Sequence, residues 1–511
     1  MEACVEPRSD YEHEEDGNEY TKFGNSNSGG LKISDQIDLD EDSTITLKEK
    51  STRRPINWSV KKKLYYTAIY GLITFAAQLN STTTTAEFPD EMKHSFGIGR
   101  EVSLLSTTLY ILGIAFGPMF FAPLSEVYGR KLGVMIPFFI SALFTFATAI
   151  SYNVPAIMIC RFISGFFSGA PIVSSGGVLS DIWLPAERGK ALAFYAVFVS
   201  SGATFGPVIS SLMVESETSI GNRWRIPLYF SGLLDFFLLG ISVLTIEETY
   251  EPVITSKIAK RIRTCTHNWT IHSKLETKQL NRDEIISVHL VRPFAMLATP
   301  IIFIIALFAS YSFGIFYIFV TTCSEAFYIT RGWENTEGTL PNVALFLGVV
   351  LGCGTNMLGA NDYGKKVKLN GGKALPEERF QIMMKLGWLM PAGLFVFAWT
   401  QYPHIHWIVP CIGVLMLGCG FVTVFQGCLN YLVDGFTGYS ASAIAANTFL
   451  RSLFAAAFPL FGKQLMVNLG VHWGTSLIGF VALGMIPIPF VFYRYGKQIR
   501  SKNPYGEKSV V

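Results

Sequence analysis

Long apolar runs are the feature that most constrains what this 511-residue chain can fold into. A helix needs about 20 apolar residues to cross a hydrocarbon core about 30 Å thick. Twelve runs meet this requirement, over approximately 64–86, 102–124, 132–152, 156–180, 190–213, 226–247, 294–322, 341–360, 382–400, 406–428, 440–463 and 472–494. Strands of a membrane β-barrel show extended alternation of apolar and polar residues, and the sequence contains no such pattern. The sequence therefore predicts an all-α membrane protein with twelve transmembrane helices.

The composition agrees with a membrane protein and argues against several other classes. Half of the residues are hydrophobic and 15% are charged, whereas soluble proteins carry about 25% charged residues. The net charge of +3 and the lack of any nucleic-acid-binding motif argue against a nucleic-acid partner. The eight cysteines lack the spacing of a metal site or a disulfide framework. We therefore expect a monomer in the lipid bilayer, without metal and without nucleic acid.

No residue pattern in the chain indicates an enzyme. The sequence has no glycine-rich phosphate loop and no Ser-His-Asp or His-Glu arrangement typical of a catalytic site. Any driving energy must then come from an ion gradient or from the substrate gradient. We expect no cofactor and no catalytic residue.

Lysine and arginine are concentrated on one side of the predicted helices. With the N-terminus in the cytosol, five lie in the stretch 53–63 at the start of the first run, eight lie between the sixth and seventh runs, and six follow the eighth, whereas the outer segments together hold six. Such a bias is typical of cytosolic loops. We therefore predict that both termini are cytosolic and that the protein lies in the cell membrane, with the vacuolar membrane as an alternative.

A short internal repeat supports a division of the chain into two halves of six runs. A Tyr-Gly-basic-basic turn follows the second run at 128–131 and the eighth run at 363–366. A Leu-Xaa-Asp sequence ends the fourth run at 179–181 and the tenth at 432–434. Two related six-helix bundles with substrate bound between them are a transporter architecture.

The predicted domains follow from this division. The first sixty residues are polar, with acidic patches, and are typical of a disordered segment. The predicted parts are a disordered acidic cytosolic tail (1–60), an N-terminal six-helix bundle (61–248), a basic cytosolic central loop (249–293), a C-terminal six-helix bundle (294–494) and a cytosolic tail (495–511).

The hexapeptide 202–207, Gly-Ala-Thr-Phe-Gly-Pro, interrupts the fifth apolar run. Gly202 and Gly206 are four residues apart and share one helical face, and Pro207 favours a bend. Membrane helices tolerate such residues where a neighbouring helix packs closely against them. By itself the hexapeptide predicts a packing face.

Several motifs together resemble the major facilitator superfamily, and within it the fungal twelve-span drug:proton antiporters, over about residues 60–500. Residues 122–131 look like the signature between spans two and three, with Ala122 in place of glycine and Glu126 in place of aspartate. Residues 161–165 resemble the span-four arginine motif. The hexapeptide resembles the span-five antiporter motif, with serines at 210–211 where a closing glycine pair is usual.

The resemblance implies the major facilitator fold and a secondary active transporter. Its expected activity is the export of small organic compounds, xenobiotic drugs or toxic secondary metabolites, by proton antiport with alternating access. The proton gradient would supply the energy. A polyamine:proton antiporter, an importer of the same fold and a non-transporting membrane sensor remain as alternatives.

The resemblance also implies a gate on the cytosolic side, formed by charged residues in the short connections between helices. Composition alone favours another explanation, in which these residues follow the positive-inside bias or are ordinary solvated loop charges. The gate candidates are Glu126, Gly129, Arg130, Lys131, Glu187 and Arg188.

Three charged residues within the apolar runs are candidates for proton coupling, because intramembrane charge is costly and usually functional. Arg161 lies in the fourth run and either takes part in proton transfer or snorkels to the interface. Asp235 lies about 13 Å along the helix from Ile226, near mid-membrane. It either titrates during transport or stays protonated and bonded to Ser231. Arg451 in the eleventh run calls for an acid or amide partner.

Aromatic and amide side chains are the candidates for substrate contact. An apolar, aromatic-rich cavity with few polar groups suits bulky amphipathic molecules, although aromatic residues also fill lipid-facing and interfacial positions. The cavity candidates are Gln78, Asn80, Tyr195, Tyr317 and Gln426.

Acidic residues also lie at the predicted outer ends of two spans. Glu87 and Asp90 follow the first run, and Glu325 follows the seventh. They either attract cationic substrate and relay protons, or are solvated interface charges, which is the more common case.

Overall fold

The computed structural model describes the chain over residues 37–39, 43–85, 88–216, 223–277, 287–333, 335–369, 375–436 and 439–505. Eleven helices in this part of the chain are long and apolar enough to cross a membrane. A twelfth, α1 (Val60–Thr82), has lower hydropathy because it begins with three lysines and carries Gln78 and Asn80 near its end. It nevertheless packs along α6 (Pro185–Ser216). The predicted all-α class with twelve transmembrane helices is confirmed.

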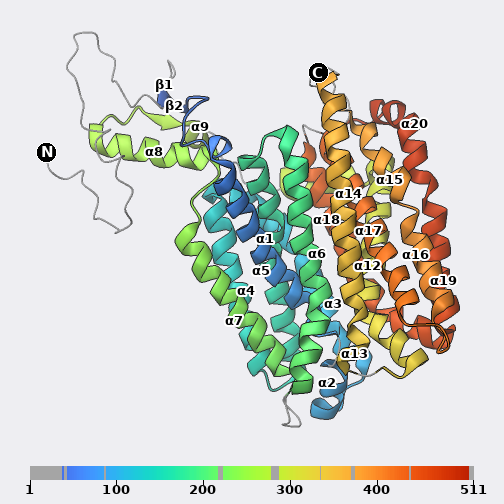
Figure 1. Cartoon of the computed structure of the whole chain (residues 1–511). Helices are drawn as coiled ribbons and strands as arrows, with labels where there is room; N and C mark the ends of the chain where they lie inside the picture. The colour runs from blue at the N-terminus through green and yellow to red at the C-terminus, as the bar shows by residue number, and fades with distance from the viewer. Residues whose placement is uncertain are drawn as a thin grey trace, which may run out of the picture.

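The N-terminal bundle contains six long helices, coloured from blue to green in Figure 1. Besides α1 and α6 they are α3 (Arg100–Tyr128), α4 (Arg130–Ile150), α5 (Val154–Ile182) and α7 (Arg225–Thr245). α5 packs against both α3 and α4, and α7 packs against α4 and α1. Glycines and other small residues at these contacts let the backbones approach closely.

The C-terminal bundle, coloured from yellow to red, is built from continuous and split spans (Figure 1). The continuous helices are α12 (Pro300–Arg331), α14 (Pro341–Leu369), α17 (Ile408–Gly435) and α18 (Ser440–Asn468). The split ones are the ninth span, α15 (Phe380–Leu386) with α16 (Leu389–Thr400), and the twelfth, α19 (Gly470–Met485) with α20 (Pro487–Ser501). The second break coincides with Pro487, which has no backbone N–H to donate.

The seventh span begins later than predicted. Residues Arg292–Leu297 form a separate short helix, α11, after the turn η2 (Ser287–Val291), and α12 starts at Pro300 rather than at residue 294. Proline is favoured in the first turn of a helix because its missing N–H is not needed there. The apolar run therefore contains a helix boundary that hydropathy alone does not reveal.

We name the two ends of the molecule by the chain termini. The terminal face is the end at which α1 begins and α20 ends, and the opposite face carries α2 (Phe88–Phe96) and α13 (Asn335–Thr339) (Figure 1). By the positive-inside prediction, the terminal face is the cytosolic one. Between the two faces, the bundles meet along α3 against α18 and along α6 against α14.

A small unit at the terminal face joins the N-terminal segment to the central loop, and we call it the tail–loop unit (Figure 1). It consists of β1 (Ile37–Leu39), β2 (Thr44–Leu47), α8 (Glu251–Thr266), β3 (His272–Ser273) and α9 (Lys274–Thr277). β1 pairs antiparallel with β2, with Ile37 opposite Leu47, and β2 pairs parallel with β3, with Thr44 opposite His272.

The tail–loop unit corrects the prediction of a disordered tail through residue 60. Ile45 and Leu47 of the tail pack with Ala259, Ile262 and Ile271 of the central loop in a small apolar core. The turn η1 (Pro55–Asn57) then leads into α1. With Ile37, six buried apolar side chains form this core, and their burial favours order in a segment of polar composition. Residues 1–36 and 40–42 lie outside the described residues.

Candidate functional site

Arg161 on α5 is completely buried and binds the end of α1. Its guanidinium donates to the carbonyl oxygen and to Oδ1 of Asn80, both at 3.0 Å, and to Thr84 Oγ1 at 3.1 Å. Longer bonds reach the carbonyl oxygens of Ser81 and Ser106, each at 3.4 Å. The last carbonyls of a helix have no partner within the helix, and a basic side chain can satisfy them. Arg161 therefore holds the C-terminal end of α1 in place.

Asn80 belongs to this buried network rather than to a substrate cavity. Its Nδ2 donates to Thr145 Oγ1 at 2.6 Å while its Oδ1 accepts from Arg161. The side chain has no exposed surface. The structure thus places Asn80 inside the N-terminal bundle as a support for Arg161.

Asp235 on α7 is buried in the same bundle without a partner. Neither carboxyl oxygen has a hydrogen bond among the described residues, and the side chain is 1% exposed. The expected bond to Ser231 is absent, since Ser231 Oγ donates to the carbonyl oxygen of Pro227 at 2.9 Å instead. A buried carboxyl group without a hydrogen bond strongly disfavours its ionised form.

Tyr110 on α3 connects the surroundings of Arg161 and Asp235. Its ring centroid lies 4.4 Å from the guanidinium carbon of Arg161, and it is close enough to Asp235 for an electrostatic interaction. Its hydroxyl lies 2.7 Å from Ser168 Oγ and donates to the carbonyl oxygen of Ala77 at 2.9 Å. Tyr110 therefore contacts Arg161 and lies within electrostatic range of Asp235, and no described contact joins the two predicted proton-coupling residues of this bundle.

Tyr317 on α12 links the two bundles near the middle of the molecule. Its hydroxyl donates to Gln78 Oε1 on α1 at 3.1 Å and lies 3.2 Å from Ser81 Oγ. Tyr195 on α6 bonds within its own bundle, to Thr74 Oγ1 at 2.9 Å. Of the predicted cavity residues, Gln78 and Tyr317 are therefore in direct contact across the bundle interface.

Arg451 on α18 lies against aromatic rings rather than the expected acid or amide. Its guanidinium carbon is 4.6 Å from the ring centroid of Phe313 and 5.1 Å from that of Phe425. Its Nε atom is buried without a hydrogen-bond partner. Tyr195 and Tyr317 are near enough to interact with its charge. The side chain is therefore a cation at the bundle interface that no described carboxylate neutralises.

The hexapeptide of the fifth span forms the contact between α6 and α1. A Cβ added at Gly202 would overlap the carbonyl oxygen of Phe75, and one added at Gly206 would overlap Thr82 Oγ1. Thr82 Oγ1 also donates to the carbonyl oxygen of Ala203 at 3.0 Å. Pro207 lies within α6, which continues past it to Ser216. The glycine face thus fixes the distance between α6 and α1, the helix that carries Gln78.

The other side of α6 faces the C-terminal bundle. The ring of Phe205 lies 4.9 Å from that of Phe346 on α14, measured between centroids. The hexapeptide therefore lies between α1 on its glycine face and α14 beyond Phe205, at the interface of the two bundles.

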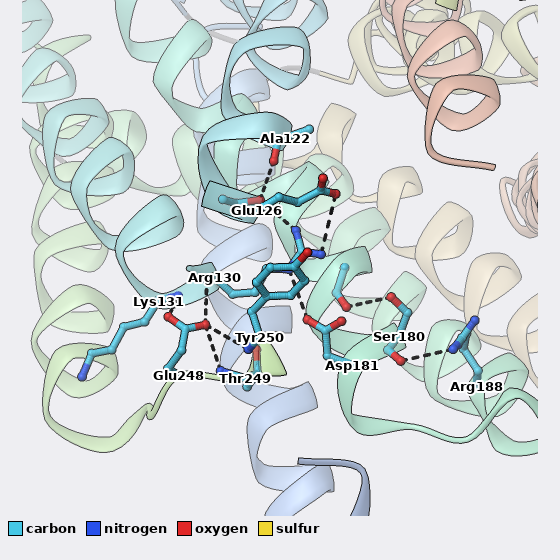
Figure 2. Close-up of polar contacts among 12 residues, drawn as sticks. Ala122, Glu126, Arg130, Lys131, Ser180, Asp181, Arg188, Glu248, Thr249 and Tyr250 are labelled. Carbon is cyan, nitrogen blue, oxygen red and sulfur yellow. Dashed lines mark hydrogen bonds and ion pairs between the residues drawn. The ribbon is translucent and has the colours of Figure 1, made fainter. Parts of the chain in front are cut away.

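Arg130, at the start of α4, organises the terminal face of the N-terminal bundle (Figure 2). Its Nε donates to Asp181 Oδ2 at 3.1 Å and its Nη1 to Ser125 Oγ at 2.8 Å. Glu126 is more distant, with 4.0 Å between its Oε1 and Nη2 of Arg130. Tyr250 covers the guanidinium at 4.9 Å, and burial, together with the negative charge of Glu126, raises the pKa of this phenol so that it stays neutral.

Glu248, which the sequence reasoning missed, closes the turn between α3 and α4 (Figure 2). Its carboxylate accepts the backbone N–H groups of Arg130 at 2.8 Å and Lys131 at 3.3 Å. Free N–H groups at a helix start attract a carboxylate. Gly129 has φ +98°, and a Cβ there would overlap Glu248 Oε2. Position 129 therefore requires glycine for two reasons, the positive φ of the backbone and the space that the Glu248 carboxylate occupies.

The remaining predicted gate residues also bond within the N-terminal bundle. Lys131 Nζ donates to the carbonyl oxygen of Val243 at 3.1 Å, and Arg188 Nη2 donates to that of Ser180 at 3.1 Å. Glu187 is exposed. In this conformation the gate candidates thus stabilise one bundle, and none of the contacts described for them bridges to the other.

The C-terminal bundle has an equivalent arrangement at its terminal face. Asp434, at the end of α17, accepts from Arg379 Nε and from the hydroxyl of Tyr363, both at 2.7 Å. Arg500 of α20 pairs with Glu377 at 3.1 Å. In the N-terminal half, Asp181 thus ties the end of the fourth span to the start of the third, and Glu248 follows the sixth span. In the C-terminal half, Asp434 ties the end of the tenth span to the start of the ninth, and Arg500 belongs to the twelfth span.

The repeat aligned in the sequence identifies the acid of this arrangement but not its basic partner. Lys365 and Lys366 match Arg130 and Lys131 in the repeat, yet they pair with Asp362 at 3.2 Å and Glu378 at 2.6 Å. Arg379 takes the role of Arg130. The signal that could have found it is a basic residue at the start of the ninth span, opposite Asp434.

The two bundles are tied together by charged residues at the opposite face. Glu325 on α12 pairs with Arg100 of α3 at 3.0 Å and with Lys463 of α18 at 2.6 Å. Arg100 also lies 3.8 Å from Asp90. Glu325 is thus an ion-pair partner rather than a solvated charge. Glu87 lies outside the described residues.

Additional cross-bundle hydrogen bonds lie on the same side. Gln464 Nε2 donates to Glu101 Oε1 at 2.5 Å, and Thr336 Oγ1 donates to Glu215 Oε2 at 2.5 Å. The cross-bundle hydrogen bonds and ion pairs identified among the described residues thus lie at the opposite face or near the middle. The structure represents a conformation that is closed at the opposite face.

A polar pocket of about 70 Å³ lies at the terminal face, between α6 and the C-terminal bundle. Gly189 lines it from α6, and Asn356, Arg379, Gln426 and Asn430 line it from the other bundle. Sites for drug-sized molecules measure about 300–1,000 Å³. The pocket is therefore smaller than such a site, and a drug-sized molecule would require it to widen.

Comparison with known families places this chain among membrane transporters. The model of the Major Facilitator Superfamily matches residues 70–459. The chain is 36% identical over 495 residues to "Efflux pump bik6" of Gibberella fujikuroi, which covers 95% of this chain and 99% of that protein. It is 36% identical over 455 residues to "Major facilitator superfamily multidrug transporter FLU1" of Candida albicans, covering 88% of this chain and 74% of that protein.

The solved structures agree on the fold. The proton:xylose symporter XylE, bound to 6-bromo-6-deoxy-D-glucose, superposes with a TM-score of 0.59 at 13% identity, covering 86% of this chain and 96% of that one. At this identity the likeness concerns the arrangement of helices and carries no information on substrate.

Proposed function

The chain belongs to the Major Facilitator Superfamily, and from this premise we propose that it exports small organic compounds, xenobiotic drugs or toxic secondary metabolites, in exchange for protons. The observation that carries the proposal is the position of the cross-bundle hydrogen bonds and ion pairs of the described residues, which lie at the opposite face or near the middle. The ion pair between Arg100 and Glu325 joins the bundles at the opposite face, while the polar pocket lies at the terminal face. Alternating access requires such a state and a second one closed at the other face. The names of the relatives in Gibberella and Candida support export.

The proton in this scheme is carried by Asp235. Its carboxyl group is buried without a hydrogen bond, so it is stable only when protonated in this conformation. A movement of α7 that brings water or Arg161 to the carboxyl group would release the proton. Arg161 is held by neutral oxygens of α1 and shares Tyr110 with Asp235, so a shift of α1 changes the electrostatic surroundings of both residues.

The test is accumulation of drugs and aromatic dyes in inside-out membrane vesicles with an imposed pH gradient. We expect accumulation when the vesicle interior is acidic, and its loss on addition of a protonophore. Accumulation that ignores the pH gradient would contradict proton antiport. Lack of any transport by reconstituted, folded protein would contradict the exporter itself.

Asp235→Asn tests the proton site within the same assay. The amide cannot release a proton, so gradient-driven accumulation should fall at least tenfold, while exchange of substrate across vesicles without a gradient continues. Ser231→Ala, which removes a nearby buried hydroxyl that does not bond to Asp235, is the matched control and should retain accumulation. An unchanged rate and pH profile in Asp235→Asn would assign the proton to another group.

A further inference from the structure

Arg451 is a buried cation to which the scheme above gives no role. The side chain is 8% exposed, and within the described residues it makes neither a hydrogen bond nor an ion pair. Its contacts are the faces of Phe313 and Phe425. Such cation–π contacts compensate part of the cost of desolvating a guanidinium but leave its N–H donors free. An intramembrane charge without a protein partner points to a ligand that supplies one.

The two other charges in the middle of the spans are placed differently. Arg161 is saturated by oxygens of α1 and by Ser106 and Thr84. Asp235 lies on α7, which packs within the N-terminal bundle. The charge at the bundle interface, where this fold binds substrate, is therefore positive among the described residues.

The rings around Arg451 form flat walls. Phe316 and Phe421 are stacked, with ring centroids 4.4 Å apart, and Phe421 stacks on Phe425 at 5.9 Å. Phe313 lies 5.5 Å from Phe425. The planes of Phe313 and Phe425, the two rings that contact Arg451, are inclined by 43°. Aromatic faces in such a tilted arrangement can pack against another planar ring.

Two further polar groups, on the helices that carry Arg451 and Phe313, also lack partners among the described residues. Asn447 precedes Arg451 by one turn on α18, and its Oδ1 is buried without a hydrogen bond. Ser310 precedes Phe313 by three residues on α12, and its Oγ is likewise unpartnered. An interface that leaves a guanidinium, an amide and a hydroxyl unpaired resembles a binding site prepared for a polar ligand more than a packed core.

We propose that Arg451 binds the anionic group of a planar aromatic substrate, a carboxylate or phenolate, while the rings of Phe313 and Phe425 stack on its aromatic system. This assignment rests on the proposed function and names its substrate class. A polyamine or another organic cation would meet an uncompensated positive charge at this position.

The experiment compares two dyes that share a xanthene ring system and differ in charge, anionic fluorescein and cationic rhodamine 123. Their binding to purified wild-type protein in detergent is measured by fluorescence anisotropy at pH 7.5, with no membrane gradient. We expect fluorescein to bind at least tenfold more tightly. Binding of neither dye, equal binding of both, or tighter binding of rhodamine 123 would overturn the proposal.

Variants then assign the selectivity to Arg451. Arg451→Gln should weaken fluorescein binding about tenfold or more, the range for losing a hydrogen bond to a charged group, and should leave rhodamine 123 binding equal or stronger. Arg451→Lys retains the charge and should keep most of the preference. Arg161→Lys is the comparison at the other buried guanidinium and should not change the ratio of the two affinities. An unchanged ratio in Arg451→Gln would overturn the assignment even if wild type prefers fluorescein.

The binding assay separates this inference from the proposed function. Selective anion binding without proton-driven accumulation would leave the inference intact and contradict antiport. Proton-driven export with no preference for the anionic dye would support antiport and contradict the inference.

Discussion

At the scale of single residues, the buried arginines of this protein differ in the groups that surround them. Arg161 is surrounded by oxygen atoms and supports a helix end, whereas Arg451 is surrounded by rings and keeps its donors free. Arg130 lies between these cases, with an acid, a hydroxyl and an aromatic ring as partners. The partner set, rather than burial alone, decides whether a buried arginine stabilises the fold or is available to a ligand.

Gly129 offers a prediction at this scale. Gly129→Ala would place a side chain at φ +98° and against Glu248, so it should lower stability by about 1–3 kcal/mol and displace the carboxylate from the start of α4. Thermal unfolding of the purified protein in detergent measures the effect. Gly176→Ala, at a helical position with open space around it, is the control and should be neutral or slightly stabilising. Equal unfolding temperatures for the two variants would contradict this explanation.

At the scale of elements, helix contacts at the bundle interface combine packing with function. α6 touches α1 through Gly202 and Gly206 and touches α14 through Phe205. The spacing of α6 and α1 therefore sets where Gln78 meets Tyr317 of the other bundle. The hexapeptide is a packing face, as its small residues predict, and it lies where the two bundles meet.

Gly206→Val should force α6 away from α1. The added methyl groups would collide with Thr82 and with the backbone of Leu79, and such overpacking costs about 1–3 kcal/mol. We expect a lower unfolding temperature and at least tenfold slower dye export in vesicles. Gly240→Val on α7, where nothing lies within contact distance, should change neither. Normal export by Gly206→Val would mean that the helix spacing is not critical for transport.

The tail–loop unit gives a second prediction for elements. Ile45 is 1% exposed in its core, so Ile45→Asp would bury a charge and should release β1 and β2 from α8. Limited proteolysis should then cut between residues 37 and 58, while the long helices unfold at the wild-type temperature. Thr46→Asn, on the more exposed side of β2 and without a charge opposite Asp38, is the control and should remain resistant. Cleavage at the same rate in both variants would argue against a folded unit.

At the scale of the whole molecule, the two bundles are similar in architecture but joined asymmetrically. Each has its own ion-pair cluster at the terminal face, around Asp181 and around Asp434. At the opposite face the bundles are joined by the ion pair of Arg100 with Glu325 and by the hydrogen bond of Gln464 to Glu101, while Lys463 pairs with Glu325 within the C-terminal bundle. Clusters within a bundle keep it rigid, and ties between bundles decide which face is closed.

Glu325→Gln should weaken closure of the opposite face. Glu325 is largely buried between two cations, and removing one partner of such a pair costs about 3 kcal/mol, or about 100-fold in the population of the closed state. Hydrogen-exchange mass spectrometry should show faster exchange in α2 and α13. Asp90→Asn, which removes the acid near Arg100 within the same bundle, is the control. Exchange that is equally slow in both variants would show that Glu325 does not hold this face.

The sequence by itself determined the membrane class, the twelve spans and the Gly202–Gly206 packing face, because hydropathy and helical spacing are local properties. It also identified Asp181 and Asp434 as equivalent residues. Only the tertiary structure decided their partners, Arg130 and Arg379, the role of Glu248, and the placement of Asn80 beside Arg161 rather than at the interface. It likewise decided that Arg451 faces rings and that Glu325 joins the bundles. These facts depend on which helices are neighbours and on how each helix is rotated about its axis. Both are determined by contacts between residues that lie far apart in the sequence.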